Sequence, residues 1–180
     1  MKQTLFRVLG LAILVFMLPI HTANAGNLNA VINGKSFHVD STYEWNEDNY
    51  GFGLEYEFAK ESRWRPIALV SGFRDSNDEM SYIAGGGLHR RLLEAEAFGG
   101  LYLDAGVNAF LMTRQDVNDN KPFAGILPSL SFGNRRVGFN LTYLPIDRLQ
   151  KLMHVEIADP TIRSIYFLQF KVSMSQLLPD

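Results

Sequence analysis

The sequence contains no cysteine, so it can form neither a disulfide framework nor a cysteine-ligated metal site. Its charge is nearly balanced, with a formal net charge of -2 and no basic block, which excludes the pattern typical of nucleic-acid-binding proteins. After residue 25 no apolar run reaches the about eighteen residues that a membrane helix needs. No His, Asp and Glu residues share the spacing of metal ligands, and we expect neither a metal nor another cofactor.

Residues 1–25 have the three parts of a secretory signal peptide. Positive charge precedes an apolar stretch from Leu9 to Ile20, and Ala23-Asn24-Ala25 supplies the small residues that a signal peptidase requires. The apolar stretch is short for a membrane helix, although a retained amino-terminal anchor is the alternative. We therefore predict export with cleavage after Ala25, and a single domain formed by residues 26–180.

The exported part of the chain is predicted to be built of β-strands, because apolar and polar side chains alternate along it. The stretch from Tyr50 to Phe58 shows this best, with an aromatic and apolar set on one face and Gly or Glu on the other. The eight predicted strands are Ala30–Val39, Tyr50–Phe58, Pro66–Arg74, Met80–Arg90, Gly99–Met112, Pro122–Phe132, Arg136–Leu144 and Ser164–Val172.

Short and long connections alternate between these strands. The short ones are residues 59–63, 92–97 and 133–135, and the longer, more polar ones are 43–49, 113–121 and 145–163. Strand length and the alternation of short and long loops together predict an all-β fold. The predicted architecture is an eight-stranded antiparallel transmembrane β-barrel in the outer membrane, with its apolar side chains toward lipid. A soluble periplasmic barrel of the lipocalin type, which also has eight strands and would carry lipid with its apolar face inside, is the alternative.

Three candidate catalytic residues are expected at one rim of this barrel. If the first strand rises to the outer face, its end places His38 beside the turn that contains Asp75 and Ser76. Histidine can take a proton from serine while a carboxylate orients the imidazole, which is the chemistry of acyl transfer. Asp and Ser in a β-turn commonly bond their own backbone, so a purely structural turn is the alternative. His89 is expected near the opposite end of the barrel.

Several segments resemble the PagP-type lipid A palmitoyltransferases of the Gram-negative outer membrane. The hairpin from Phe73 to Gly87 resembles the family segment F-K-D-S…I-A-G-x-G. The segments Ile126–Leu130 and Val137–Pro145 are similar to L-L-P-L…V-T-F-Q-M-T-Y-I-P. Shorter matches occur in the same order at Gly51–Leu54, Ala105–Val107 and Ile165–Phe167.

The resemblance implies an enzyme that moves a palmitoyl or similar chain from a glycerophospholipid to a hydroxyacyl chain of lipid A. It implies that His38, Asp75 and Ser76 form the catalytic site, with His38 as base, Ser76 as nucleophile or hydrogen-bond partner, and Asp75 as charge partner or orienter. The first outer loop is shorter here than in the family. A non-enzymatic small barrel that binds lipid or stabilises the membrane is the competing hypothesis.

The resemblance also implies where the lipid chain binds. Gly87 matches the glycine at the floor of the family's acyl pocket, where a larger side chain would shorten the accepted chain. Pro128 and Pro145 match prolines that leave gaps in strand pairing, since proline donates no hydrogen bond to a sheet, and lipid would pass sideways there. A monomer in the membrane is expected.

Overall fold

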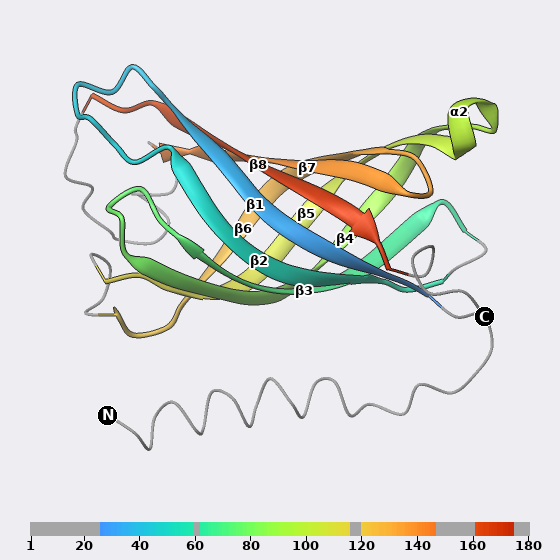
Figure 1. Cartoon of the computed structure of the whole chain (residues 1–180), viewed down its shortest axis with the longest axis horizontal. Helices are drawn as coiled ribbons and strands as arrows, with labels where there is room; N and C mark the ends of the chain where they lie inside the picture. Colours follow the sequence, from blue (N-terminus) through green and yellow to red (C-terminus); the bar gives the residue numbers. More distant parts are fainter. Residues whose placement is uncertain (1–25, 60–61, 116–119, 147–160, 175–180) are drawn as a thin grey trace.

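The computed structural model describes residues 26–59, 62–115, 120–146 and 161–174 (Figure 1). The predicted signal peptide lies outside the described residues. Helices long and apolar enough to cross a membrane are absent from the described part of the chain. The elements in chain order are β1 (Asn27–Val39), β2 (Asp48–Glu57), β3 (Trp64–Arg74), β4 (Met80–Ala95), the single turn α2 (Ala97–Gly100), β5 (Leu101–Thr113), β6 (Phe123–Gly133), β7 (Val137–Pro145) and β8 (Ser164–Ser173).

The eight strands form a closed antiparallel barrel, as the sequence predicted (Figure 1). Each strand pairs with the next, and β8 pairs with β1 from Asn29↔Ser173 to Val39↔Ser164. Every strand therefore has a partner on both sides, as a barrel in lipid requires because hydrocarbon cannot satisfy backbone N–H and C=O groups. We call the end that carries residues 40–47 and 75–79 the loop end, and the opposite end the α2 end.

The connection between β4 and β5 differs from the prediction. The sequence pattern placed a turn at residues 92–97, whereas β4 stays paired with β5 as far as Ala95↔Leu101. A bulge at Leu92 absorbs one extra residue in this ladder. The chain then reverses in α2, where Phe98 and Gly99 have φ angles of 53° and 80°. The hairpin therefore projects beyond its neighbours at the α2 end (Figure 1).

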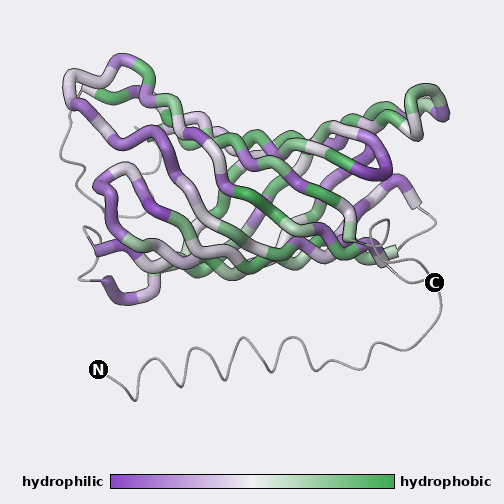
Figure 2. Tube along the Cα trace, viewed as in Figure 1, coloured by the Kyte–Doolittle hydropathy of each residue, from purple (hydrophilic) through white to green (hydrophobic). Residues whose placement is uncertain are grey.

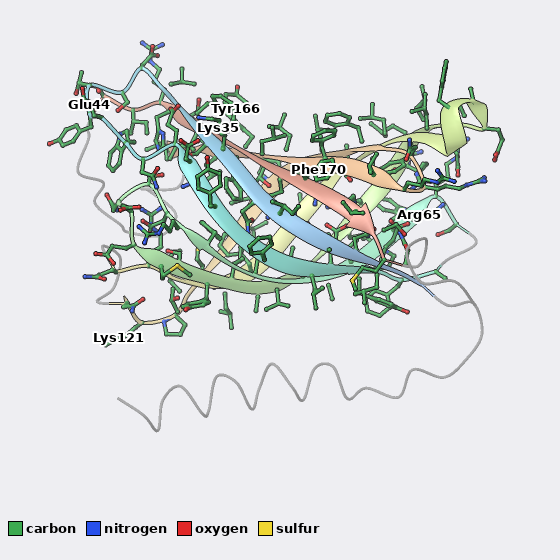
Figure 3. The ribbon with its side chains drawn as sticks, in the orientation of Figure 1. Lys35, Glu44, Arg65, Lys121, Tyr166 and Phe170 are labelled. Atoms are coloured by element: carbon green, nitrogen blue, oxygen red, sulfur yellow. The ribbon has the colours of Figure 1, made fainter. Side chains whose placement is uncertain are left out.

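Apolar side chains cover the outside of the barrel, which confirms the predicted orientation of the strands. On β2, Tyr50 and Phe52 are 67% and 76% exposed, while Glu55 on the opposite face is 2% exposed. Hydropathy alternates along the strands accordingly, and side chains project outward around the wall (Figures 2 and 3). A soluble barrel buries the apolar face instead, so this inversion is the pattern of a barrel that faces lipid.

The interior near the α2 end is filled with paired charges. Glu55 accepts hydrogen bonds from Lys171 Nζ at 2.7 Å and from Asn140 Nδ2 at 2.8 Å. Arg91 makes a two-pronged contact with Asp104, with distances of 2.6 Å and 3.1 Å. Buried charges are tolerated when each is paired and hydrogen-bonded, and these groups tie β2, β4, β5, β7 and β8 together across the lumen.

Candidate active site

The loop end brings His38 and Ser76 into direct contact. His38 is the next-to-last residue of β1, and Ser76 lies in the turn after β3. The Nε2 atom of His38 is 3.0 Å from the Oγ atom of Ser76, and the His38 side chain is 3% exposed. A hydroxyl hydrogen-bonded to an imidazole nitrogen is the arrangement in which histidine can take a proton from an attacking oxygen.

Asp75 serves the turn rather than the imidazole. Its carboxylate accepts hydrogen bonds from the N–H groups of Asn77 at 2.9 Å and Glu79 at 3.2 Å, and from Ser81 Oγ at 2.7 Å. Arg114 Nε lies 3.6 Å from the same carboxylate, which is almost fully buried. Asn77, Glu79 and Ser81 lie in or next to the β3–β4 turn, whereas Arg114 follows β5, and His38 is not among these partners. Asp75 thus fixes the backbone that carries Ser76.

The carboxylate beside His38 belongs to Glu47, a residue that the sequence analysis did not single out. Glu47 Oε1 lies 3.4 Å from His38 Nδ1 and accepts the backbone N–H of His38 at 3.1 Å. Trp45 stacks on the imidazole, with ring centroids 5.4 Å apart and planes 15° apart. The sequence shows Glu44, Glu47 and Asp48 in the same short segment, and nothing in its pattern tells which of them reaches the histidine.

Hydrogen bonds join the first loop to the β3–β4 turn. Asn46 donates its backbone N–H to Ser76 O at 3.0 Å and its side-chain amide to Asp75 O at 3.1 Å. Asn49 donates to Arg74 O at 2.9 Å. The two segments that supply Glu47 and Ser76 are therefore one hydrogen-bonded unit, and Figure 3 shows Glu44 of the same loop at the end of the barrel opposite Arg65.

The barrel interior below this rim holds both apolar and polar side chains. Phe73 and Leu127 are buried toward the loop end, and Phe73 packs against Phe167 with ring centroids 5.2 Å apart. Toward the α2 end, His89 Nε2 lies 2.9 Å from Asn108 Oδ1 and 3.0 Å from Ser129 Oγ. Asn108 Nδ2 also donates to Ser129 Oγ at 3.1 Å. We call these three residues, His89, Asn108 and Ser129, the polar floor.

Gly87 lies on β4 two residues from His89, on the loop side of the polar floor. It pairs with Ile67 on β3 and with Asn108 on β5. A Cβ atom at position 87 would overlap the side-chain oxygen of Asn108 and come within 2.9 Å of the Val107 carbonyl oxygen. Glycine at this position therefore leaves room for the Asn108 side chain to contact His89 and Ser129.

The ladder between β6 and β7 stops short of the loop end. The ladder joining these strands runs only from Gly133↔Gly138 to Ser129↔Thr142, whereas β5 pairs with β6 as far as Phe123. Pro128 is the first β6 residue beyond the short ladder. Pro145, the last residue of β7, pairs with Ser164 on its other side. Neither proline has an N–H group to extend the β6–β7 ladder.

Within the described residues, no group of three or more His, Cys, Asp or Glu side chains is arranged to hold a metal ion. The Ser36 Oγ and Asn49 Oδ1 atoms are buried near the loop end and have no hydrogen-bond partner in the described structure. At the rim, His38 can transfer a proton, and Ser76 can supply hydroxyl or hydrogen-bonding chemistry.

An inverted eight-stranded barrel with a Ser–His pair at one rim defines a membrane β-barrel with the features of an acyl-transfer site. The sequence profile of the family described as antimicrobial peptide resistance and lipid A acylation protein PagP matches residues 21–151. Because this match covers more than half of the chain, the protein belongs to the PagP family.

Curated relatives and solved structures give the following likenesses. The lipid A acyltransferase PagP of Bordetella pertussis is 29% identical over 129 residues, covering 68% of this chain and 69% of the relative. The protein of the same name from Methylobacillus flagellatus is 28% identical over 111 residues, or 61% of this chain and 58% of the relative. Neisserial surface protein A superposes with a TM-score of 0.42 at 13% identity, covering 86% of this chain and 100% of that structure. Ail of Yersinia pestis gives 0.39 at 11% identity, covering 83% and 99%.

Proposed function

We propose that this protein is an acyltransferase that acts on lipid A in the outer membrane of a Gram-negative bacterium. The observation that carries the proposal is the 3.0 Å contact between His38 Nε2 and Ser76 Oγ at the rim of a lipid-facing barrel. Membership of the PagP family and the relatives named as lipid A acyltransferases support it. The proposed donor is a glycerophospholipid, and the acceptor is a hydroxyl group on an acyl chain of lipid A.

In the proposed reaction, His38 Nε2 accepts the proton of the hydroxyl group that attacks the donor ester carbonyl. The ester C–O bond then breaks, and the proton passes to the leaving lysophospholipid oxygen. Attack by Ser76 gives an acyl-serine that the lipid A hydroxyl resolves, whereas direct attack by lipid A leaves Ser76 as a hydrogen-bonding group. Intact-mass analysis of the protein with donor alone separates the routes, because only the first adds an acyl mass to the chain.

The proposed position of the acyl chain is the barrel interior between the rim and Gly87. The buried side chains of Phe73, Ile67 and Leu127 support this placement, because methylene groups gain free energy by contacting apolar surface. Advance past Gly87 would bring methylene groups against the polar floor and displace hydrogen bonds there, which costs free energy. Gly87 and the polar floor would together limit the length of the accepted chain.

Lipid is proposed to pass through the wall between β6 and β7. The short ladder and the flanking residues Pro128 and Pro145 support this route. Replacing Pro128 with Ala supplies an N–H group that can extend the ladder toward β7. We expect the KM for the phospholipid donor to rise several-fold with barrel stability retained, and an unchanged KM would contradict the route.

Export and assembly complete the proposal. Residues 1–25 would be removed as a signal peptide after Ala25, and residues 26–180 would insert as a monomer. Amino-terminal sequencing of the protein purified from outer membranes tests the cleavage site. Mass measurement of the detergent complex tests the monomer.

The deciding experiment measures lipid A itself. The protein is expressed in a Gram-negative host that lacks its own enzyme of this kind, and lipid A is examined by mass spectrometry after membrane perturbation. We expect the mass to increase by one fatty acyl group with the native chain and to stay unchanged with His38→Ala. Unmodified lipid A despite a folded barrel would instead support the non-enzymatic barrel, and activity that survives both His38→Ala and Ser76→Ala would exclude the proposed site.

A further inference from the structure

We propose that Glu47 is the positioning carboxylate of this site and that it sets the tautomer and orientation of His38. The inference rests on the proposed function, because it assigns a role within the same reaction. Glu47 does not touch the reacting atoms itself, and its effect passes through the imidazole. It takes the place in a Ser–His–carboxylate relay that the resemblance implied for Asp75.

The contacts of His38 define this role from three sides. Nε2 faces Ser76 Oγ at 3.0 Å, Nδ1 faces Glu47 Oε1 at 3.4 Å, and the Trp45 ring covers one face. A hydrogen bond from Nδ1–H to a carboxylate leaves Nε2 with its lone pair directed at the serine. That tautomer is the one able to accept a proton from an attacking hydroxyl group. The carboxylate also stabilises the positive imidazolium that then forms.

Asp75 is not available for this role. Its two carboxylate oxygens are occupied by two backbone N–H groups, by Ser81 and by Arg114. Glu47 is more exposed, with 40% of its side chain accessible, and its Oε1 atom faces both the backbone N–H and the Nδ1 atom of His38. The distance of 3.4 Å is long for a hydrogen bond, and such bonds in catalytic sites commonly shorten when substrate binds.

The short first loop is what brings Glu47 to the histidine. Glu47 O accepts the backbone N–H of Ser36 at 2.9 Å, which fixes Glu47 alongside β1 two residues from His38. Asn46, the preceding residue, is bonded to the backbone of Asp75 and Ser76. The loop thus sets the spacing between carboxylate, imidazole and hydroxyl group at once.

The test compares Glu47→Gln with Glu44→Gln, since Glu44 lies exposed in the same loop and its substitution changes the charge equally. Folding of each variant is checked by heat-dependent gel migration and far-ultraviolet circular dichroism. We expect Glu47→Gln to lower kcat by about 10- to 100-fold with little change in KM, a loss of the size seen when the hydrogen-bond partner of a metal-ligating histidine is removed. Glu47→Asp, which keeps the carboxylate, should recover part of kcat, and Glu44→Gln should behave as the native protein.

A spectroscopic measurement distinguishes positioning from simple support of the loop. The nitrogen-15 shifts of His38 in detergent micelles should show protonated Nδ1 and unprotonated Nε2 in the native protein. Glu47→Gln should shift this tautomer, because the Gln amide can donate to Nδ1. A native tautomer with native kcat in folded Glu47→Gln would overturn the inference. A native chain that transfers no acyl group would overturn the proposed function instead, and the tautomer, measured without substrate, would still decide whether Glu47 orients the ring.

Discussion

Gly87 and Asn108 face each other across the β4–β5 ladder, and the Asn108 side-chain oxygen occupies the space that a side chain at position 87 would need. This relationship connects the proposed acyl site to the polar floor. It also makes the depth of the proposed acyl site sensitive to one residue.

We expect Gly87→Met to shorten the acyl chain that is transferred, because the added side chain fills the space at the end of the proposed acyl site. The measurement is the acyl mass added to lipid A from a mixture of donors of different chain lengths. Ala84→Met is the matched control, since Ala84 faces lipid on the same strand. Transfer of acyl chains of the same length by both variants would contradict a role for Gly87 in limiting chain length.

The polar floor should act as a second limit on chain length. His89→Leu removes the imidazole that contacts Asn108 and Ser129, while those two residues keep their own 3.1 Å hydrogen bond. An apolar side chain there lowers the cost of burying further methylene groups, so the preferred donor should become longer. The same donor mixture gives the readout. A chain-length profile identical to that of the native protein would show that the chain stops above His89.

Asp75 should matter for the turn more than for proton transfer. Asp75→Ala leaves the Ser81 hydroxyl and two backbone N–H groups without their acceptor. Hydrogen bonds to charged groups contribute about 1.5–3 kcal/mol each, and we expect the free energy of unfolding to fall by at least about that amount. Ser76→Ala, at the neighbouring position, should lose activity with native stability. Urea unfolding of the barrel in lipid vesicles measures the stability of both variants. Native stability in Asp75→Ala would contradict the role of Asp75 in holding the turn.

Replacing only one member of the buried ion pair between Lys171 and Glu55 should lower the free energy of unfolding. Both side chains are buried, at 7% and 2% exposure, and their atoms are 2.7 Å apart. Lys171→Met leaves an uncompensated buried carboxylate, which typically destabilises a protein by about 3–5 kcal/mol. The double variant Lys171→Met with Glu55→Gln should recover much of that loss in the same unfolding experiment. Breaking the exposed Arg135–Glu96 pair as a control should cost less than about 1 kcal/mol.

Strand alternation made most of the fold predictable from the sequence. In the stretch from Tyr50 to Phe58, aromatic and apolar side chains alternate with Gly and Glu along the strand. This alternation indicates a sheet with one apolar face and one polar face. Loop lengths then placed His38 and Ser76 at the same end of the barrel, and the structure brings them into contact. The turn residues Asp75 and Ser76 were recognisable because Asp and Ser bond backbone groups locally.

Other parts of the site depend on contacts between segments whose proximity cannot be predicted from the sequence pattern. His89, Asn108 and Ser129 come from β4, β5 and β6, and only the barrel register brings their polar atoms together. The proximity of Glu47 to His38 likewise follows from how the first loop folds back onto β1. A pattern of alternation contains no information on such distances.

A bulge decided which way His38 points. On the first part of β1 the buried side chains that face the barrel interior are Asn29, Val31 and Asn33. Strict alternation along the strand would then turn Lys35 and Phe37 inward and His38 toward lipid. The register of β1 shifts between Asn33 and Lys35, against both β2 and β8. Ser36 is consequently buried, Phe37 is 45% exposed, and the His38 side chain lies inside.

The sequence by itself thus determined the strands, the orientation of their apolar faces and the rim on which the candidate residues lie. The tertiary structure alone decided the direction of His38 and the carboxylate that supports it. The physical reason is that alternation is a local property of the backbone, whereas a bulge and a loop contact are set by pairing between strands distant in the chain.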